Sequence, residues 1–277
     1  MSAALAADRD PLARRYRRLG TALAGLTYVF LVLPSLIVIP ISFGGRNAIE
    51  LVPHTFSLDL YRDFFFTATW RGPLLQSLKI AFATMLATIV VAVPAAYALV
   101  RFDFVGKRAL TMLIMSAVFV PVIVIALGLY LYFARLGLSG SNIGLVLGHT
   151  VYVTPFVMLT MMAGVKQLDP TLEFAATMMG ASRTRLFTRV VLPQLVPSIL
   201  ASALFAFLIS FDEVVIAWFL SSATTTTLPV RMYSSIQWDV SPVIAAISVL
   251  LTALSFIVCL VSVALQPTEP RQAQPAP

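Results

Sequence analysis

The chain has 277 residues, of which 59% are hydrophobic and only 11% are charged, and its mean hydropathy is +0.92. Soluble domains lie far from this composition, so the chain is predicted to be an integral membrane protein with no room for a separate soluble catalytic domain. The net charge of +7 comes from basic residues scattered at the ends of apolar segments, without an interleaved aromatic patch. This pattern argues against nucleic-acid binding and favours a topology signal.

Six apolar segments are each long enough to cross a bilayer, since a span needs about 20 mainly apolar residues. In chain order they run near Leu19 to Phe43, Leu74 to Val100, Ala109 to Ala134, Ile143 to Val165, Gln194 to Leu220 and Val243 to Leu265. The first follows a run of arginines, as a secretory signal peptide does, but it is too long and lacks a small-residue cleavage site. We therefore predict that it is a retained span.

These segments predict an all-α fold, a polytopic transmembrane bundle of six helices over residues 19–265. A basic segment precedes it at residues 1–18, and a polar, proline-rich tail at residues 266–277 is predicted to be disordered. Cytoplasmic loops carry the excess of Lys and Arg. With the N-terminus in the cytoplasm, the basic residues left outside are only Arg46, Arg62, Arg71, Lys79, Arg135 and Arg231. Both termini and the loop of residues 166–193 are therefore predicted to be cytoplasmic.

Two features of the segments before that loop predict local structure. In the connection from Gly44 to Gly72, the apolar residues Leu58, Tyr61, Phe64 and Phe65 recur at helical spacing, which predicts an amphipathic helix on the outer surface. At the start of the fourth segment, Gly140, Gly144 and Gly148 recur every fourth residue. Such spacing permits close helix approach, either within this chain or to a partner permease.

The loop of residues 166–193 carries the signals of two short helices. Asp169 is a good N-cap, Pro170 suits the first helical position, and Gly180 can end the helix in a left-handed conformation. Ser182 can cap a second helix over Arg183 to Val190, with a proline stop at residues 192–193 before the fifth span. On the first helix, Phe174 and Met178 share one face. That face either packs under its own bundle or docks into a groove of a cytoplasmic protein.

The same loop resembles the coupling loop of the membrane subunits of ATP-binding-cassette importers, in which Glu-Ala-Ala, three residues and Gly are followed by a hydrophobic residue and Leu-Pro. The residues at matching positions are Ala175, Ala176, Gly180, Ala181, Val191, Leu192 and Pro193. Phe174 stands where the glutamate is usual. Glu173, one residue earlier, fits a pattern of two acidic residues before the alanines that is common in the spermidine/putrescine-type branch, so the second acid is the one replaced. The runs 210–213 and 227–230 also resemble that branch, so the chain is identified as a type I, binding-protein-dependent importer permease.

The resemblance implies that other protein chains supply functions that this chain does not have. It has no G-x-x-x-x-G-K-[ST] sequence, so it is not expected to be an enzyme or to hold a cofactor, and ATP and Mg would be bound by a separate ATPase dimer. The remaining implied partners are a second, related permease chain forming a heterodimer, a periplasmic substrate-binding protein and the bilayer of the bacterial inner membrane. The helix of residues 170–179 would act as a lever. The implied ATPase-coupling residues are Glu173, Phe174, Ala175, Ala176, Met178, Gly180, Ala181 and Arg183.

Asp212 and Glu213 are carboxylates within a predicted span, which by default mark a pathway or a buried partner. They lie roughly 28 Å along the fifth span from Pro193, toward the outer side. Since successive helical residues diverge by about 100°, we expect one carboxylate to face the path and the other to pair with a neighbouring helix or outer water. A structural role for both near the outer interface is the alternative, and Trp218 either lines the path or anchors the interface.

These residues predict a solute path for a small, cationic or amino-containing molecule, because a carboxylate in a low-dielectric path attracts an ammonium strongly. The resemblance to the spermidine/putrescine-type branch implies a polyamine-like solute as the first candidate. Opines, amino-acid-like amines, thiamine and phosphonates are alternatives within the same family, and a stand-alone secondary transporter is the alternative outside it. His54 and His149 are too few and too distant in sequence to predict a metal site.

Overall fold

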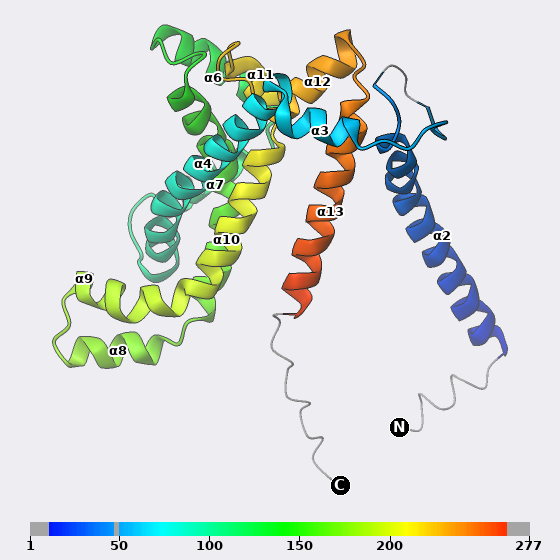
Figure 1. Ribbon diagram of the computed structural model, residues 1–277. Coiled ribbons are helices and arrows are strands. Elements are labelled where there is room, and N and C mark those ends of the chain that lie inside the picture. Colours follow the sequence, from blue (N-terminus) through cyan, green and yellow to red (C-terminus); the bar gives the residue numbers. More distant parts are fainter. Residues whose placement is uncertain (1–10, 47–49, 265–277) are drawn as a thin grey trace. The chain divides into compact units, whose positions relative to one another are not determined.

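The computed structural model describes residues 11–46 and 50–264, and every regular element in these ranges is a helix (Figure 1). The predicted disordered tail and the first part of the predicted basic segment lie outside the described residues. The chain divides into two compact units. The elements in chain order are α2 (Pro11–Ser42), α3 (Asp59–Phe66), α4 (Ala68–Arg101), α5 (Lys107–Ser116), α6 (Val122–Arg135), α7 (Asn142–Gln167), α8 (Pro170–Met178), α9 (Arg183–Leu186), the π-helix η1 (Phe187–Val191), α10 (Leu192–Asp212), α11 (Val215–Leu220), α12 (Leu228–Trp238) and α13 (Val243–Ala264).

One unit combines the two ends of the chain, with α2 and α3 both packed on α13. The helix predicted in the segment from Gly44 to Gly72 is present as α3. Its buried residues are Leu60 and Phe64, of which only Phe64 belongs to the predicted apolar set. Polar contacts hold α3 to the preceding segment. Ser42 Oγ lies 2.7 Å from the Tyr61 hydroxyl, and Arg46 Nε donates to Asp63 Oδ2 at 2.6 Å. This bidentate pairing with Asp63 raises the pKa of Arg46.

The other unit, residues 68–239, is built on the long helices α4, α7 and α10, which pack on one another around an apolar core. Small residues set how closely these helices approach. A Cβ at Gly164 of α7 would overlap Ser198 of α10, and a Cβ at Gly148 would lie 2.5 Å from Leu220 Cδ1 of α11. The glycine spacing predicted to permit close approach is thus used at Gly148 for packing within this chain.

Four helical stretches among the described residues are long and apolar enough to cross a membrane: Leu19–Ser42, Ala68–Arg101, Asn142–Gln167 and Arg183–Asp212. They fall on the predicted first, second, fourth and fifth segments. The stretches Val122–Arg135 and Val243–Ile257, on the third and sixth, are shorter. The predicted all-α membrane fold is confirmed, whereas the count of six spanning helices is not confirmed by length and composition alone.

The predicted third span is two helices rather than one. The chain leaves the helix after Ser116 and re-enters it at Val122. Pro121, with ψ 131°, precedes α6. A proline has no backbone N–H and disfavours helical conformation in the residue before it, so the break coincides with Pro121.

The predicted fifth span also differs from the structure at both ends. The helix continues without a break from Arg183 to Asp212, so the predicted proline stop at residues 192–193 is wrong. Pro193 is accommodated in the first turn of α10, directly after the wider π-helical turn of η1, where the backbone hydrogen-bond pattern shifts. At its other end the helix stops at Asp212, and α11 begins at Val215.

Candidate coupling site and solute path

The predicted lever is present as α8, and its ends carry the predicted capping groups. Asp169 Oδ1 accepts a hydrogen bond from the Thr171 backbone N–H at 2.9 Å, and this bond lowers the pKa of Asp169. Pro170 occupies the first turn. At the other end Gly180 has φ +79°, and the Ala181 N–H donates to the Ala176 carbonyl at 3.0 Å. Local sequence therefore determines where this helix starts and stops.

Most apolar side chains of α8 are exposed, and Ala176 is half-buried. Phe174 and Met178 have 68% and 72% of their surface accessible, and no residue of α8 is buried. Packing of this face under its own bundle, one of the two predicted alternatives, is therefore not observed. Ala175 is likewise exposed, Ala181 is half-buried, and Arg183, at the start of α9, is exposed. An unpartnered apolar face of this kind is suited to a groove on another protein.

Glu173 is mostly covered, unlike its exposed neighbour Phe174. Its Oε1 lies 2.8 Å from Arg101 Nε in an ion pair, and its Oε2 accepts a hydrogen bond from the Tyr97 hydroxyl at 2.8 Å. Arg101 also donates to the Leu168 carbonyl at 2.9 Å. The side chains of Arg101 and Glu173 are only 18% and 14% exposed. Glu173 is thus held inside the chain, a position that its place in the predicted coupling loop did not indicate.

A cavity of about 620 Å³ lies beside this ion pair. It is bordered by the end of α4, by α8 and by the segment from Ala181 to Phe187. Figure 1 shows α8 and α9 at one end of the unit and α11 and α12 at the other. The predicted coupling residues and the predicted path residues therefore gather at opposite ends of α10.

Glu213 is buried, with 7% of its surface exposed, and acts as a cap for α11. Its Oε1 accepts the N–H groups of Val215 and Ile216 at 2.9 Å, and its Oε2 accepts that of Ala217 at 2.9 Å. His149 Nε2 of α7 lies 3.7 Å from the same carboxylate. Negative charge over the first turn of a helix is stabilising. This arrangement supports a structural role for Glu213.

Asp212, the last residue of α10, is exposed and lies next to this cap. Trp218 of α11 is 43% exposed, and its ring packs edge-on against Tyr233 with centroids 5.1 Å apart. Asp212 and Glu213 are adjacent in sequence, but the first is exposed and the second is buried. Asp212 as a path residue stays a prediction.

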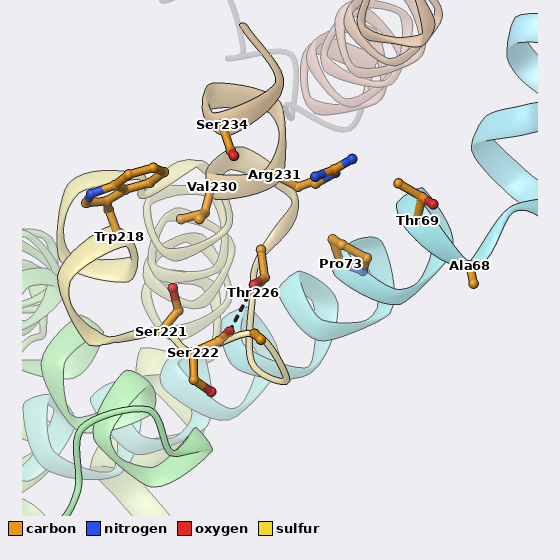
Figure 2. A pocket seen from close by; sticks show the side chains of 11 residues that line it. Ala68, Thr69, Pro73, Trp218, Ser221, Ser222, Thr226, Val230, Arg231 and Ser234 are labelled. Atoms are coloured by element: carbon orange, nitrogen blue, oxygen red, sulfur yellow. Dashed lines mark hydrogen bonds between the residues drawn. The ribbon is translucent and has the colours of Figure 1, made fainter. Parts of the chain in front are cut away.

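A second cavity, of about 580 Å³, contains Trp218 in its wall together with hydroxyl side chains (Figure 2). Its lining includes Ser221, Ser222, Thr226, Ser234 and Arg231. The Arg231 guanidinium lies 5.4 Å from the ring centroid of Trp70, a cation–π distance. Sequence reasoning missed Ser221 and Ser222 as lining residues, and it named Arg231 only as a basic residue on the outer side. The density of hydroxyl residues between Leu220 and Leu228 was the signal available.

Neither Asp212 nor Glu213 is among the residues that line this cavity. Over residues 11–46 and 50–264, no three His, Cys, Asp or Glu side chains form a group that could hold a metal ion.

Comparisons with known proteins place this geometry among transport proteins. Residues 88–268 match the family model described as "Binding-protein-dependent transport system inner membrane component". The chain is 30% identical over 238 residues to the spermidine/putrescine transport system permease protein PotC of Haemophilus influenzae, covering 86% of this chain and 92% of that protein. It is 28% identical over 258 residues to the putrescine transport system permease protein PotI of Escherichia coli, covering 87% of each.

Among solved structures, the chain is similar to one described as a bacterial ABC transporter involved in the import of the acidic polysaccharide alginate. The TM-score is 0.76 at 16% identity, covering 93% of this chain and 99% of that one. A second structure, of an alginate transporter in complex with a pentasaccharide-bound periplasmic protein, gives a TM-score of 0.62 at 16% identity and covers 88% of this chain and 92% of that one. At this identity the likeness establishes the fold.

Proposed function

We propose a solute and a coupling mechanism for this chain, which belongs to the family of binding-protein-dependent transport system inner membrane components. It is a permease subunit of an ATP-binding-cassette importer, a multi-pass protein of the inner membrane. The solute that we propose is a polyamine such as spermidine or putrescine. The observation that carries this proposal is the similarity to polyamine permease proteins over most of both chains.

The proposed assembly has four kinds of component besides the bilayer. They are this chain, a second permease of related sequence, an ATPase dimer that binds ATP and Mg, and a periplasmic binding protein. We count six crossings by taking α5 with α6 as the third and α10 with α11 as the fifth. Both termini and α8 then face the cytoplasm, in agreement with the distribution of Lys and Arg.

In the proposed coupling mechanism, the exposed face of α8 docks on the ATPase. Phe174 and Met178 supply adaptable apolar contacts, and Arg183 adds a charge at the edge. Closure of the ATPase dimer on ATP moves α8 as a rigid body. Because the helix from Arg183 to Asp212 is uninterrupted, the movement is carried along α10 toward the opposite end of the unit.

Asp212 is the carboxylate that we propose meets the cationic solute. It is exposed, whereas Glu213 is occupied by three backbone N–H groups. Charge attraction strengthens as a path becomes less polar, so a single carboxylate can favour entry of an ammonium group.

One observation favours a second solute class. The cavity in Figure 2 includes the cation Arg231 and several hydroxyls in its wall but no carboxylate, which suits a solute bearing an acidic group, such as an opine. If this cavity, rather than the surroundings of Asp212, receives the solute, an opine should be taken up and a polyamine should not.

The test is uptake by the reconstituted complex. The chain is purified in gentle detergent with the proteins that bind it, reconstituted in liposomes with the binding protein, and supplied with labelled spermidine and ATP. We expect uptake that requires ATP inside and the binding protein outside. Uptake of an opine in place of spermidine would overturn the polyamine proposal, and uptake without any ATPase would overturn the importer mechanism.

The docking face has a matched control in the same experiment. Met178→Asp should reduce the amount of ATPase that copurifies, because it places a charge in the apolar contact. Val105→Asp changes a fully exposed apolar residue in the loop between α4 and α5 and should leave the copurified ATPase unchanged. Equal loss in both variants would show that α8 is not the docking element.

A further inference from the structure

We infer that Tyr97, Arg101 and Glu173 form a latch that fixes α8 to the end of α4, so that α4 moves together with α8 when the ATPase closes. This inference rests on the proposed function. It assigns Glu173 the part of a positioning residue inside the permease rather than that of a contact to the ATPase.

The need for a latch follows from how little else holds α8. This helix has nine residues, none of them buried, and its docking side chains are exposed. A break at Leu168 and Asp169 separates it from α7, and the turn containing Gly180 separates it from α9. A short helix connected at both ends by non-helical segments would move relative to the rest of the unit unless a side chain fixed it.

The latch joins two parts of the chain that are far apart in sequence, the end of α4 and the segment from Leu168 to Glu173. The carboxylate of Glu173 on α8 meets Arg101 Nε at 2.8 Å and the Tyr97 hydroxyl at 2.8 Å, and both partners belong to α4. Arg101 also donates to the Leu168 carbonyl at 2.9 Å, in the break that precedes α8. One guanidinium therefore holds both α8 and the segment on which α8 turns.

Tyr97 extends the connection to η1. Its ring packs against Phe187 with centroids 5.2 Å apart and meets Phe102 edge-on at 5.7 Å. Tyr97 itself is buried in the core shared by α4, α7 and α10. A displacement of α8 is thus transmitted to the three core helices through side chains as well as along the backbone.

Because the pair is partly buried, breaking it should cost more free energy than breaking a surface ion pair. With side chains 18% and 14% exposed, Arg101 and Glu173 are poorly screened by water, and neutralising one leaves the other charge without its partner. The adjacent cavity of about 620 Å³ leaves room for α8 to shift once the pair is broken. We therefore expect a broken latch to free α8 from α4 without unfolding the core.

The first experiment measures transport per ATP in the reconstituted complex. Glu173→Gln and Arg101→Met should keep the ATPase bound but lower the solute imported per ATP hydrolysed by at least about fivefold, the lower end of typical coupling between sites. The exchange of charges in Arg101→Glu with Glu173→Arg should recover part of the loss. Asp103→Asn, which breaks the exposed ion pair of Asp103 with Lys107 near the same end of α4, is the matched control and should leave the ratio unchanged.

The second experiment does not depend on the solute. Cys259, which is the only cysteine, is changed to alanine, and spin labels are placed on Thr177 of α8 and Val90 of α4, both exposed positions. In the assembled complex, the distance between the labels should be the same with and without ATP and vanadate. In the Glu173→Gln variant, it should broaden or shift when the ATPase closes.

Three outcomes would overturn the latch. One is parental import per ATP in both single variants. Another is a change in the distance between the labels in the parent on ATP binding, which would mean that α8 moves apart from α4. The third is loss of the bound ATPase in Glu173→Gln, which would make Glu173 a docking residue. Failure of the parent to import spermidine would instead count against the proposed function, and the distance measurement would still test the latch.

Discussion

Replacing Glu213 should destabilise the protein, because this side chain is the acceptor for the first turn of α11. One carboxylate accepts three backbone N–H groups at 2.9 Å, and those of Ile216 and Ala217 are in buried hydrogen bonds. In Glu213→Ala these donors have no acceptor. A buried donor left unpaired costs about 1–3 kcal/mol, so the two buried groups together cost about 2–6 kcal/mol.

Glu213→Gln separates the loss of charge from the loss of hydrogen bonds. The amide oxygen can take the place of Oε1 and keep the bonds to Val215 and Ile216, whereas the amide NH₂ cannot accept from Ala217. The expected cost is about 1 kcal/mol, since one bond is lost while burial of a charge is relieved. Asp212→Asn, at the exposed neighbour, should change stability by less than about 0.5 kcal/mol.

The assay is thermal unfolding of the purified complex in detergent, with uptake measured on the same samples. For a chain of this size each kcal/mol corresponds to about 2–4 °C, so Glu213→Ala should lower the melting temperature by at least about 4 °C. An unchanged melting temperature in Glu213→Ala would refute the capping argument. Glu213→Gln that melts like the parent but no longer imports solute would place Glu213 on the path instead.

Two glycines give further predictions. Gly164→Ala should destabilise the unit by about 1–3 kcal/mol, because the new Cβ would overlap both Cβ and Oγ of Ser198, and rotation of the hydroxyl cannot relieve that. Gly128→Ala, in a helix with open space around it, should melt no earlier than the parent. Gly180→Ala should cost about 1–2 kcal/mol through its positive φ alone, since nothing lies within 4 Å, and should reduce copurified ATPase more than Gly180→Asn does.

Local signals were sufficient for the boundaries of α8. Asp169, Pro170 and Gly180 act through hydrogen bonds and backbone conformations within a few residues of one another, so their effect can be read from the sequence. The long apolar helices could also be predicted from the sequence, because length and hydropathy determine whether a segment can cross a bilayer.

The effect of each proline on its helix could not be predicted from the local sequence. Pro94 and Pro155 lie inside continuous helices, Pro193 follows a π-helical turn without a break, and Pro121 directly precedes the start of α6. A proline always lacks one hydrogen bond. Whether the helix survives depends on which neighbouring groups satisfy the freed carbonyl, and that is a property of the packing.

The two informative acids were located by sequence, but their partners were not. Glu173 stands in a recognisable loop motif, and Glu213 is one of two adjacent carboxylates in an apolar segment. Their roles come from groups distant in the chain or from a local break in the helix. Arg101 lies 2.8 Å from Glu173 although the two are far apart in sequence, and Glu213 meets the N–H groups of a helix that starts only because α10 ends at Asp212.

The amino-acid sequence by itself determined that this protein lies in a membrane, that it is helical, which family it belongs to, and where the exposed coupling helix begins and ends. These properties depend on composition, on sequence motifs or on contacts between near neighbours. Only the tertiary structure decided that Glu173 on α8 pairs with Arg101 on α4, and that Glu213 caps α11 while Asp212 stays exposed. The physical reason is that a charge in a poorly solvated place takes its role from whatever partner the fold brings within about 3 Å, and sequence spacing does not specify that partner.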